Sequence, residues 1–189
     1  MGSIRDRISI RRCLPGDEHE LKKLWREVFR DTDEFIDAFF DVFCEPGIAC
    51  VALYDDIIIS AGYCLTGVLA RGRKCSYIYA MATYPEYRGQ GAAERIGRRL
   101  IDDAFAEGAD VVATLPASLP LVGWYERKLG MTPTFRKGLP GAVFPEKWHR
   151  FSDMFGNLGS GSPEYLSAVA APGIDLNDLI GFGWELTFE

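Results

Sequence analysis

The chain has 189 residues, of which 48% are hydrophobic and 25% are charged, and its formal net charge is -6. This length and composition predict one soluble globular domain and exclude a disordered or fibrous chain. The acidic balance argues against nucleic acid or an anionic membrane as the main partner, whereas it permits a cationic substrate.

Hydrophobic spacing predicts the following elements up to residue 135: a strand at 8–12, helices from 17 and from about 33, strands at 48–54, 57–69 and 75–83, a helix at 91–107, a strand at 110–115, a helix at 119–129 and a strand at 131–135. Asp55 and Asp56 predict a hairpin turn, so the middle strands are expected to pair antiparallel. The strands on either side of the 91–107 helix should be parallel, because a crossover helix joins them. We therefore expect an α/β fold with a mixed, mostly antiparallel central sheet and helices on both faces.

The helix that begins near residue 33 has Thr32 or Asp33 as its expected N-cap. Its apolar residues recur at helical spacing and are mostly aromatic: Phe35, Ile36, Phe39, Phe40 and Phe43. Such a stripe is typical of a core, and its bulk also fits the side of a substrate pocket.

The pattern weakens after residue 135. Residues 138–162 carry many Gly, Pro and Ser residues, and Ser162-Pro163-Glu164 is typical of a helix start. One more turn is expected at 176–180 and a closing strand at 184–188. We expect a single domain over residues 1–189, with a core at about 8–135 and a C-terminal extension at 136–189 that completes the sheet.

Histidine and cysteine usage narrows the chemistry. His19 and His149 are the two histidines and lie far apart, which excludes a metal site built on several histidines and disfavours a Ser-His-Asp triad. The five cysteines form no Cys-x-x-Cys pair, and such a pattern is typical of reduced thiols in the cytosol. Neither a run of 18 apolar residues nor an N-terminal signal core is present. We expect a cytoplasmic protein without a metal.

The most informative segment is Arg88-Gly89-Gln90-Gly91-Ala92-Ala93, at the point where a strand gives way to a long helix. Small residues leave the backbone accessible, and free amides at a helix N-terminus favour an anion. This pattern predicts a phosphate or pyrophosphate ligand, although a tight strand-to-helix turn would look the same. A G-x-G-x-x-G motif is absent because Glu94 occupies its last position, and no Gly-Lys-Ser/Thr sequence occurs.

Residues 80–93 resemble the acetyl-CoA-binding motif of the GCN5-related N-acetyltransferase (GNAT) superfamily. The family pattern Arg/Gln-x-x-Gly-x-Gly/Ala is matched by Arg88, Gly91 and Ala93, and the preceding bend by Thr83-Tyr84-Pro85. Further along the chain, Trp124-Tyr125-Glu126-Arg127-Lys128-Leu129-Gly130-Met131 is similar to the family's F-Y-E-K-x-G-F. The close resemblance covers the segment from Tyr77 to Met131.

This resemblance implies an acetyl-CoA-dependent N-acetyltransferase, in which a primary amine attacks the thioester directly within a ternary complex. Acetyl-CoA would be the cosubstrate, and no metal is implied. The acetyl-CoA-binding residues that it implies are Met81, Ala82, Thr83, Arg88, Gly89, Gln90, Gly91, Ala92, Ala93 and Ser118. Tyr125 matches the family tyrosine that protonates the departing CoA thiolate, and a phenol has a suitable pKa for this step. Trp124 fits the role of a helix aromatic packed on the sheet better than Tyr125 does.

Two departures from the family leave alternatives open. Many relatives carry Glu on the strand before the loop, where this chain has Tyr79, and Ser118 stands where relatives often have Asn. The remaining candidates for the general base are Glu45, Asp55, Asp56, Glu86 and Glu189. The missing carboxylate motivates a second hypothesis, a non-catalytic acyl-CoA-binding sensor of the same fold, and a nucleotide-binding domain of another type is a third.

The expected partner is an amine acceptor on a small molecule or peptide, not nucleic acid or a membrane. The 136–189 extension is expected to cover the acceptor site. Exposed strand edges leave a homodimer open.

Overall fold

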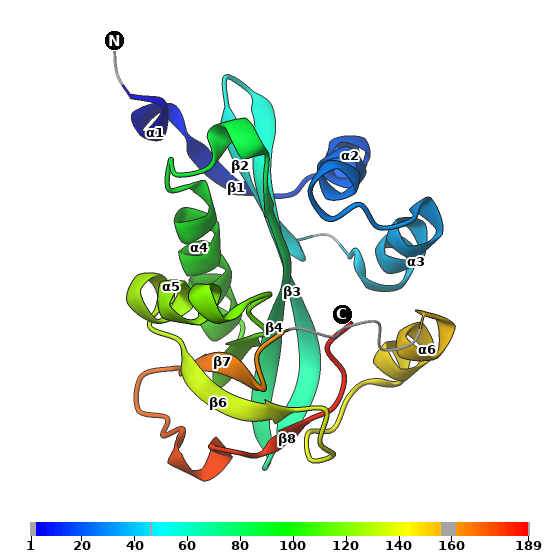
Figure 1. Ribbon diagram of the computed structural model, residues 1–189, viewed down its shortest axis with the longest axis vertical. Helices are drawn as coiled ribbons and strands as arrows, with labels where there is room; N and C mark the ends of the chain where they lie inside the picture. The colour runs from blue at the N-terminus through cyan, green and yellow to red at the C-terminus, as the bar shows by residue number, and fades with distance from the viewer. Residues whose placement is uncertain (1–2, 46, 156–161, 189) are drawn as a thin grey trace. The chain divides into compact units, whose positions relative to one another are not determined.

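The structure is a computed structural model that describes residues 3–45, 47–155 and 162–188 (Figure 1). Glu189, one of the candidate bases, lies outside the described residues. The elements in chain order are α1 (Ile4–Arg7), β1 (Ser9–Arg12), η1 (Pro15–Asp17), α2 (Glu18–Phe29), α3 (Asp33–Phe43), β2 (Ala49–Tyr54), β3 (Ile57–Ala70), β4 (Arg73–Thr83), η2 (Pro85–Tyr87), α4 (Ala92–Ala106), β5 (Val111–Thr114), α5 (Leu119–Leu129), β6 (Thr132–Lys137), α6 (Glu146–Phe155), β7 (Tyr165–Ala170), η3 (Asn177–Leu179) and β8 (Gly183–Trp184).

The strands within the described residues form one sheet in the order β1-β2-β3-β4-β5-β7-β6-β8. β2 pairs antiparallel with β1 and β3, and β7 pairs antiparallel with β5 and β6. β4 and β5 are parallel, as expected for strands that α4 connects, and β6 and β8 are also parallel. Asp55 and Asp56 have φ angles of 50° and 62°, the left-handed conformation that a tight hairpin turn requires. The predicted mixed, mostly antiparallel sheet with helices is confirmed.

The chain divides into two compact units, and β3, β4 and α4 each contribute residues to both. The first unit comprises Met1–Cys64 and Tyr79–Leu100, and the second comprises Leu65–Ile78 and Ile101–Glu189. Each unit is described by itself below.

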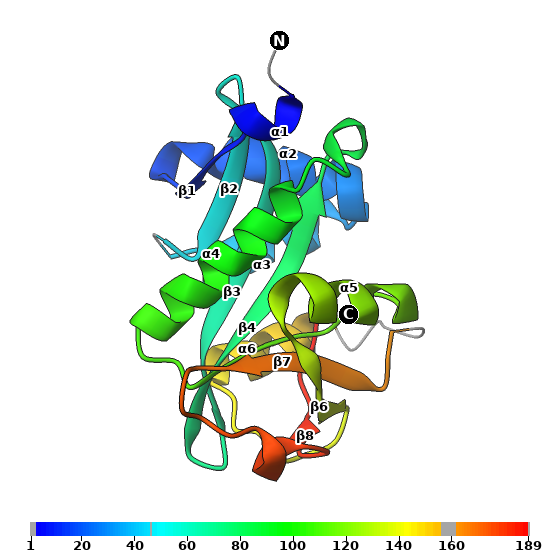
Figure 2. The ribbon, with the colours of Figure 1, turned by 90° about the vertical axis from the view of Figure 1, so that its left-hand side faces the viewer.

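The first unit has an aromatic core between α2, α3 and its strands. Trp25 of α2 has its ring centroid 4.7 Å from that of Phe39 and 5.3 Å from that of Tyr63 on β3. All five residues of the predicted α3 stripe are buried. Thr32 caps α3 because its hydroxyl accepts the amide hydrogen of Phe35 at 3.2 Å. Within this unit, α2 and α3 cover one face of the strands and the start of α4 covers the other (Figures 1 and 2).

The second unit has its own aromatic core. Tyr77 of β4 contacts Trp148 of α6 and Trp184 of β8, with ring centroids 5.8 Å and 5.7 Å away. The Tyr77 hydroxyl donates a hydrogen bond to the carbonyl oxygen of Thr187 at 3.1 Å. α5 packs against β6 and β7, and α6 lies on the opposite side of this part of the sheet (Figure 1).

The C-terminal predictions need correction. The helix predicted to start at residues 162–164 is wrong, because the strand β7 follows and pairs with both β5 and β6. The middle residues of β7, 166–168, are buried, and its pairing with two strands outweighs the local helix-start signal. The Gly- and Pro-rich region before it contains α6, which buries Trp148 and Phe151. The closing strand is confined to Gly183–Trp184, and β7 and β8 are strands of the sheet.

Candidate functional site

Strand β4 changes its conformation at Ala80. The parallel ladder pairs residues 75–78 with Val111–Thr114 and ends there. Ala80 has a φ of 49°, which residues with a Cβ atom seldom adopt, and a bend of this kind is typical of strands next to a ligand site. Residues 75–78 pair with β5 along one edge of β4. On that same edge, Met81, Ala82 and Thr83 have no ladder partner among the described residues. Their backbone can therefore pair with an extended ligand, as an added strand would.

Contacts with β3 hold the opposite edge of this segment. The hydroxyl of Ser60 donates to the carbonyl oxygen of Ala82 at 2.6 Å, and the hydroxyl of Thr83 donates to Ser60 at 2.8 Å. Met81 packs over Gly62, where an added Cβ atom would lie only 3.0 Å from the Met81 Cγ. The three residues that the sequence predicts to bind the cosubstrate are thus fixed on one edge and open on the other.

The glycine loop (residues 88–93) joins η2 to α4. Gly89 and Gly91 have φ angles of 78° and 83°, which glycine adopts without the strain that a Cβ atom would cause. The carbonyl oxygen of Gly91 accepts the amide hydrogen of Arg95 at 3.1 Å. The first amides of α4, including those of Ala92 and Ala93, therefore have no acceptor within the helix. Together with the helix dipole, they make a site for a phosphate group.

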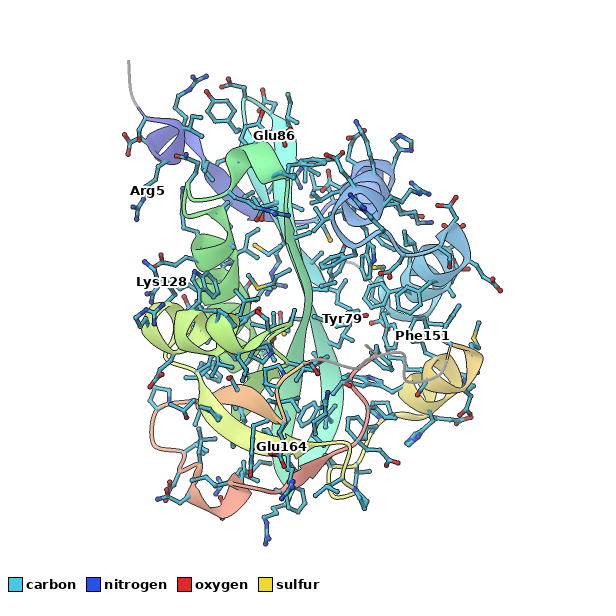
Figure 3. The ribbon with its side chains drawn as sticks, in the orientation of Figure 1. Arg5, Tyr79, Glu86, Lys128, Phe151 and Glu164 are labelled. Carbon is cyan, nitrogen blue, oxygen red and sulfur yellow. The ribbon has the colours of Figure 1, made fainter. Side chains whose placement is uncertain are left out.

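Two arginines lie at this loop, and the sequence analysis identified only one of them. Arg88 is exposed and folds back so that its Nε donates to the carbonyl oxygen of Thr83 at 3.2 Å. Arg5, on the short helix α1, places its Nε 3.6 Å from where a Cβ atom of Gly91 would lie. Figure 1 shows α1 beside this loop, and Figure 3 labels Arg5. α1 is tied to the hairpin by Arg7, which pairs with Asp55 and donates to the Tyr54 hydroxyl. No sequence signal could have revealed Arg5, because only tertiary folding brings α1 to the loop.

Tyr79, at the position where many relatives carry Glu, belongs to the aromatic cluster of the first unit. Its ring centroid lies 5.9 Å from that of Trp25 and 5.5 Å from that of Phe39 (Figure 3). Its surroundings are therefore apolar and suit packing better than proton abstraction.

The candidate bases lie at different places in the first unit. Asp55 is paired with Arg7, and Glu45 and Asp56 are exposed. Glu86, which Figure 3 labels, is exposed, and its charge acts on the buried Tyr84. Burial raises the pKa of Tyr84, and the negative charges of Glu27, Glu20 and Glu86 raise it further. These three carboxylates are exposed.

In the second unit, Tyr125 lies on α5, which ends at Gly130 in the left-handed conformation. Its side chain is 8% exposed, whereas Trp124 is only half-buried, so the expectation that Trp124 is the better-packed aromatic is wrong. Burial raises the pKa of the Tyr125 phenol, and a hydrogen bond with the Thr114 hydroxyl partly lowers it. Trp124 stands edge-on to Tyr125, with ring centroids 5.0 Å apart.

Ser118 is the N-cap residue of the same helix. Its backbone is extended, its side chain makes no capping hydrogen bond, and it is half-buried. The structure thus groups the predicted residues in two sets. Met81, Ala82, Thr83 and the glycine loop belong to the first unit, and Ser118 and Tyr125 to the second.

The helices found between residues 3 and 188 are too short or too polar to cross a bilayer. The same part of the chain holds no group of three or more His, Cys, Asp or Glu side chains that could bind a metal ion.

Comparisons with known proteins agree with the architecture. The YhbS GNAT-family N-acetyltransferase from Escherichia coli in complex with CoA is 21% identical to this chain. The match covers 93% of this chain and 87% of the YhbS chain, with a TM-score of 0.66. Arabidopsis thaliana Naa50 in complex with the bisubstrate analogue CoA-Ac-MVNAL is 16% identical to this chain. The match covers 87% of this chain and 99% of the Naa50 chain, with a TM-score of 0.58. The GCN5-related N-acetyltransferase from Anabaena variabilis is 17% identical over 68% of this chain, with a TM-score of 0.58.

The chain spans only part of several structural neighbours. It covers 45%, 33% and 32% of the length of three of them, from Pyrococcus horikoshii, Enterococcus faecalis and Anabaena variabilis. A search of curated proteins found no match. The sequence model of the acetyltransferase (GNAT) domain matches residues 9–128, which is more than half of the chain. The chain belongs to the GNAT acetyltransferase family.

Proposed function

We propose that this protein transfers the acetyl group of acetyl-CoA to a primary amine by direct attack within a ternary complex. The observation that carries the proposal is the continuous run from the bend at Ala80 to the free amides of the glycine loop. An open strand edge followed by a helix N-terminus matches a ligand with an amide-containing arm and a pyrophosphate. The neighbours crystallised with CoA and with a CoA bisubstrate analogue support this assignment.

In the proposed complex, the backbone of Met81, Ala82 and Thr83 pairs with the pantetheine arm. The amides of the glycine loop and the guanidinium of Arg88 bind the pyrophosphate. Ser118, whose hydroxyl is not used as a cap, offers one further hydrogen bond to the cosubstrate.

The proposed reaction begins when the neutral amine nitrogen attacks the thioester carbonyl carbon. The tetrahedral intermediate collapses, the carbon–sulfur bond breaks, and the sulfur leaves as a thiolate. Tyr125 gives its phenol proton to the thiolate, and the phenolate regains a proton from solvent after CoA has left. The proton that the amine loses passes to water, because Tyr79 has no carboxylate.

The acceptor class proposed is a primary amine on a small molecule or a peptide. The cytoplasm is the compartment we propose, because the five cysteines, all among the described residues, form no disulfide. We further propose that residues 136–189 contribute to the acceptor site. A homodimer remains a prediction from the sequence.

The experiment measures thermal stability with acetyl-CoA and then the release of free thiol with a panel of primary amines. We expect acetyl-CoA to raise the melting temperature and at least one amine to support thiol release that the Tyr125→Phe variant nearly loses. If saturating acetyl-CoA leaves the melting temperature unchanged, both the enzyme and the sensor hypothesis are wrong. Stabilisation without thiol release for any amine would favour the acyl-CoA sensor.

A further inference from the structure

The short helix α1 places Arg5 against the glycine loop, although Arg5 lies outside the residues 9–128 that match the family model. The Nε, Cζ and Nη2 atoms of its guanidinium are 3.6, 3.8 and 4.0 Å from the position that a Cβ atom of Gly91 would take. The next amide along the chain, that of Ala92, is the first of the free amides of α4. A phosphate group that accepts this amide hydrogen is therefore within reach of the Arg5 guanidinium.

The guanidinium of Arg5 is available to a ligand. Its side chain is exposed, and no carboxylate of the residues that the structure describes pairs with it. Two arginines of α4 have partners, since Arg95 donates to the carbonyl oxygen of Ile8 at 2.6 Å and Arg98 pairs with Glu94 at 3.2 Å. Because Arg98 offsets the charge of Glu94, this acidic residue of the first turn does not cancel the attraction of the loop for an anion.

Several contacts hold α1 in place, which matters because a helix of four residues is unstable by itself. Arg7 pairs with Asp55 and donates to the Tyr54 hydroxyl at 2.9 Å. The ring centroid of Tyr54 lies 5.8 Å from that of Tyr87, on the segment η2 directly before the loop. The hydrogen bond from Arg95 holds the residue that follows α1. The hairpin and α4, both parts of the first unit, thus fix where Arg5 lies relative to the loop.

We propose that Arg5 binds the pyrophosphate of CoA, and that Asp55 acts through Arg7 as a positioning residue that holds α1 against the loop. The inference deepens the proposed function and rests on it. A guanidinium presents two parallel N–H groups to two oxygens, which suits a phosphate group that also accepts backbone amides. No bond forms or breaks at Arg5, so its contribution is to the affinity for the cosubstrate.

The first experiment is the calorimetric titration of CoA and of 3′-dephospho-CoA, which keeps the pyrophosphate and lacks the phosphate on the ribose. Arg5→Gln should weaken the binding of both compounds by the same factor, about threefold to fivefold at low salt. Arg5→Lys keeps the charge but loses the planar fork, so it should recover only part of the affinity. A loss confined to CoA would place Arg5 at the ribose phosphate and overturn the assignment. An unchanged affinity in Arg5→Gln would overturn it as well.

The second experiment is a double-mutant cycle on the anchor. Asp55→Asn removes the charge that pairs with Arg7, and asparagine tolerates the left-handed conformation of this turn residue. We expect Asp55→Asn to weaken CoA binding about twofold, and to cause no further loss when Arg5→Gln is already present. A merely structural role of Asp55 would instead lower the affinity equally in both backgrounds, which would overturn its assignment as a positioning residue.

Asp56→Asn is the matched control for the anchor. Asp56 lies in the same turn, is also exposed and left-handed, and has no ion-pair partner among the described residues. The substitution removes the same charge, so CoA should bind at least as tightly as it binds the wild type. Equal losses in Asp55→Asn and Asp56→Asn would overturn the role of the Arg7 anchor.

Both experiments measure binding and are independent of acetyl transfer. If the wild type binds CoA but releases no thiol with any amine, the proposed acetyl transfer fails, and the titrations still decide the role of Arg5. If thiol is released and Arg5→Gln binds CoA as the wild type does, this inference alone fails. Wild-type protein that binds neither compound would overturn both.

Discussion

The glycine loop and Tyr125 provide the two parts of the proposed chemistry by different physical means. The loop uses backbone amides, is accessible, and depends on glycines in a left-handed conformation. Tyr125 uses a side chain and is buried, and burial raises the pKa of its phenol. Changes in the loop should therefore affect cosubstrate affinity, whereas changes around Tyr125 should affect the rate of the chemical step.

The largest effect is expected for Tyr125→Phe, which removes the proton donor and keeps the ring. We expect kcat to fall about 100-fold while the affinity for acetyl-CoA stays within a factor of about two. Steady-state thiol release and a separate binding titration check the two quantities. The control is Trp124→Phe, a change at the half-buried neighbouring ring, which should affect kcat far less. Equal losses for both variants would contradict the assignment of Tyr125 as the acid.

The next effect is expected for Gly91→Val in the loop. A β-branched residue at a φ of 83° is strained, so the loop must adopt another conformation to accommodate it. A cost of about 2 kcal/mol would weaken acetyl-CoA binding roughly 30-fold. Gly72→Val is the control, because Gly72 has a similar φ of 78° but lies in the turn between β3 and β4, where an added Cβ atom would have no neighbour within 4 Å. Equal binding losses in both variants would show that the effect is one of folding only.

A smaller effect is expected for Arg5→Gln, which removes a positive charge beside Gly91. An exposed ion pair with a phosphate contributes at most about 1 kcal/mol, so acetyl-CoA should bind about threefold to fivefold more weakly. The difference from wild type should shrink as the salt concentration rises, because salt screens exposed charges. Lys23→Gln on α2 removes an equal charge elsewhere and should leave the affinity unchanged. If both variants bind alike at low salt, Arg5 has no direct role.

The smallest effect concerns stability at alkaline pH. Since burial raises the pKa of Tyr125 above 10.0, the unfolded chain releases this proton at a lower pH than the folded protein. The stability associated with the neutral phenol is complete below pH 10 and is lost as the pH rises through the folded pKa. Urea unfolding of wild type and Tyr125→Phe should therefore show that the wild type loses stability more steeply above pH 10. Parallel curves would mean that the phenol titrates equally in both states.

The sequence predicts the loop well and the surroundings of Tyr125 poorly, for a physical reason. The start of α4 depends on local features, because small residues follow a strand and precede an amphipathic helix. The positions of Arg5 and of strand β7 depend on tertiary folding, since α1 has only four residues and β7 follows a segment that resembles a helix start. At Tyr79, where many relatives carry a carboxylate, the ring lies among aromatic residues, which agrees with the absence of a base at this position.

Calorimetric titration of acetyl-CoA into wild type, Gly91→Val and Tyr125→Phe tests the central claim most directly. We expect the wild type and Tyr125→Phe to bind with similar affinity and Gly91→Val to bind roughly 30-fold more weakly. Wild-type protein that shows no binding, or Gly91→Val that binds as tightly as wild type, would contradict the claim that the glycine loop holds the cosubstrate.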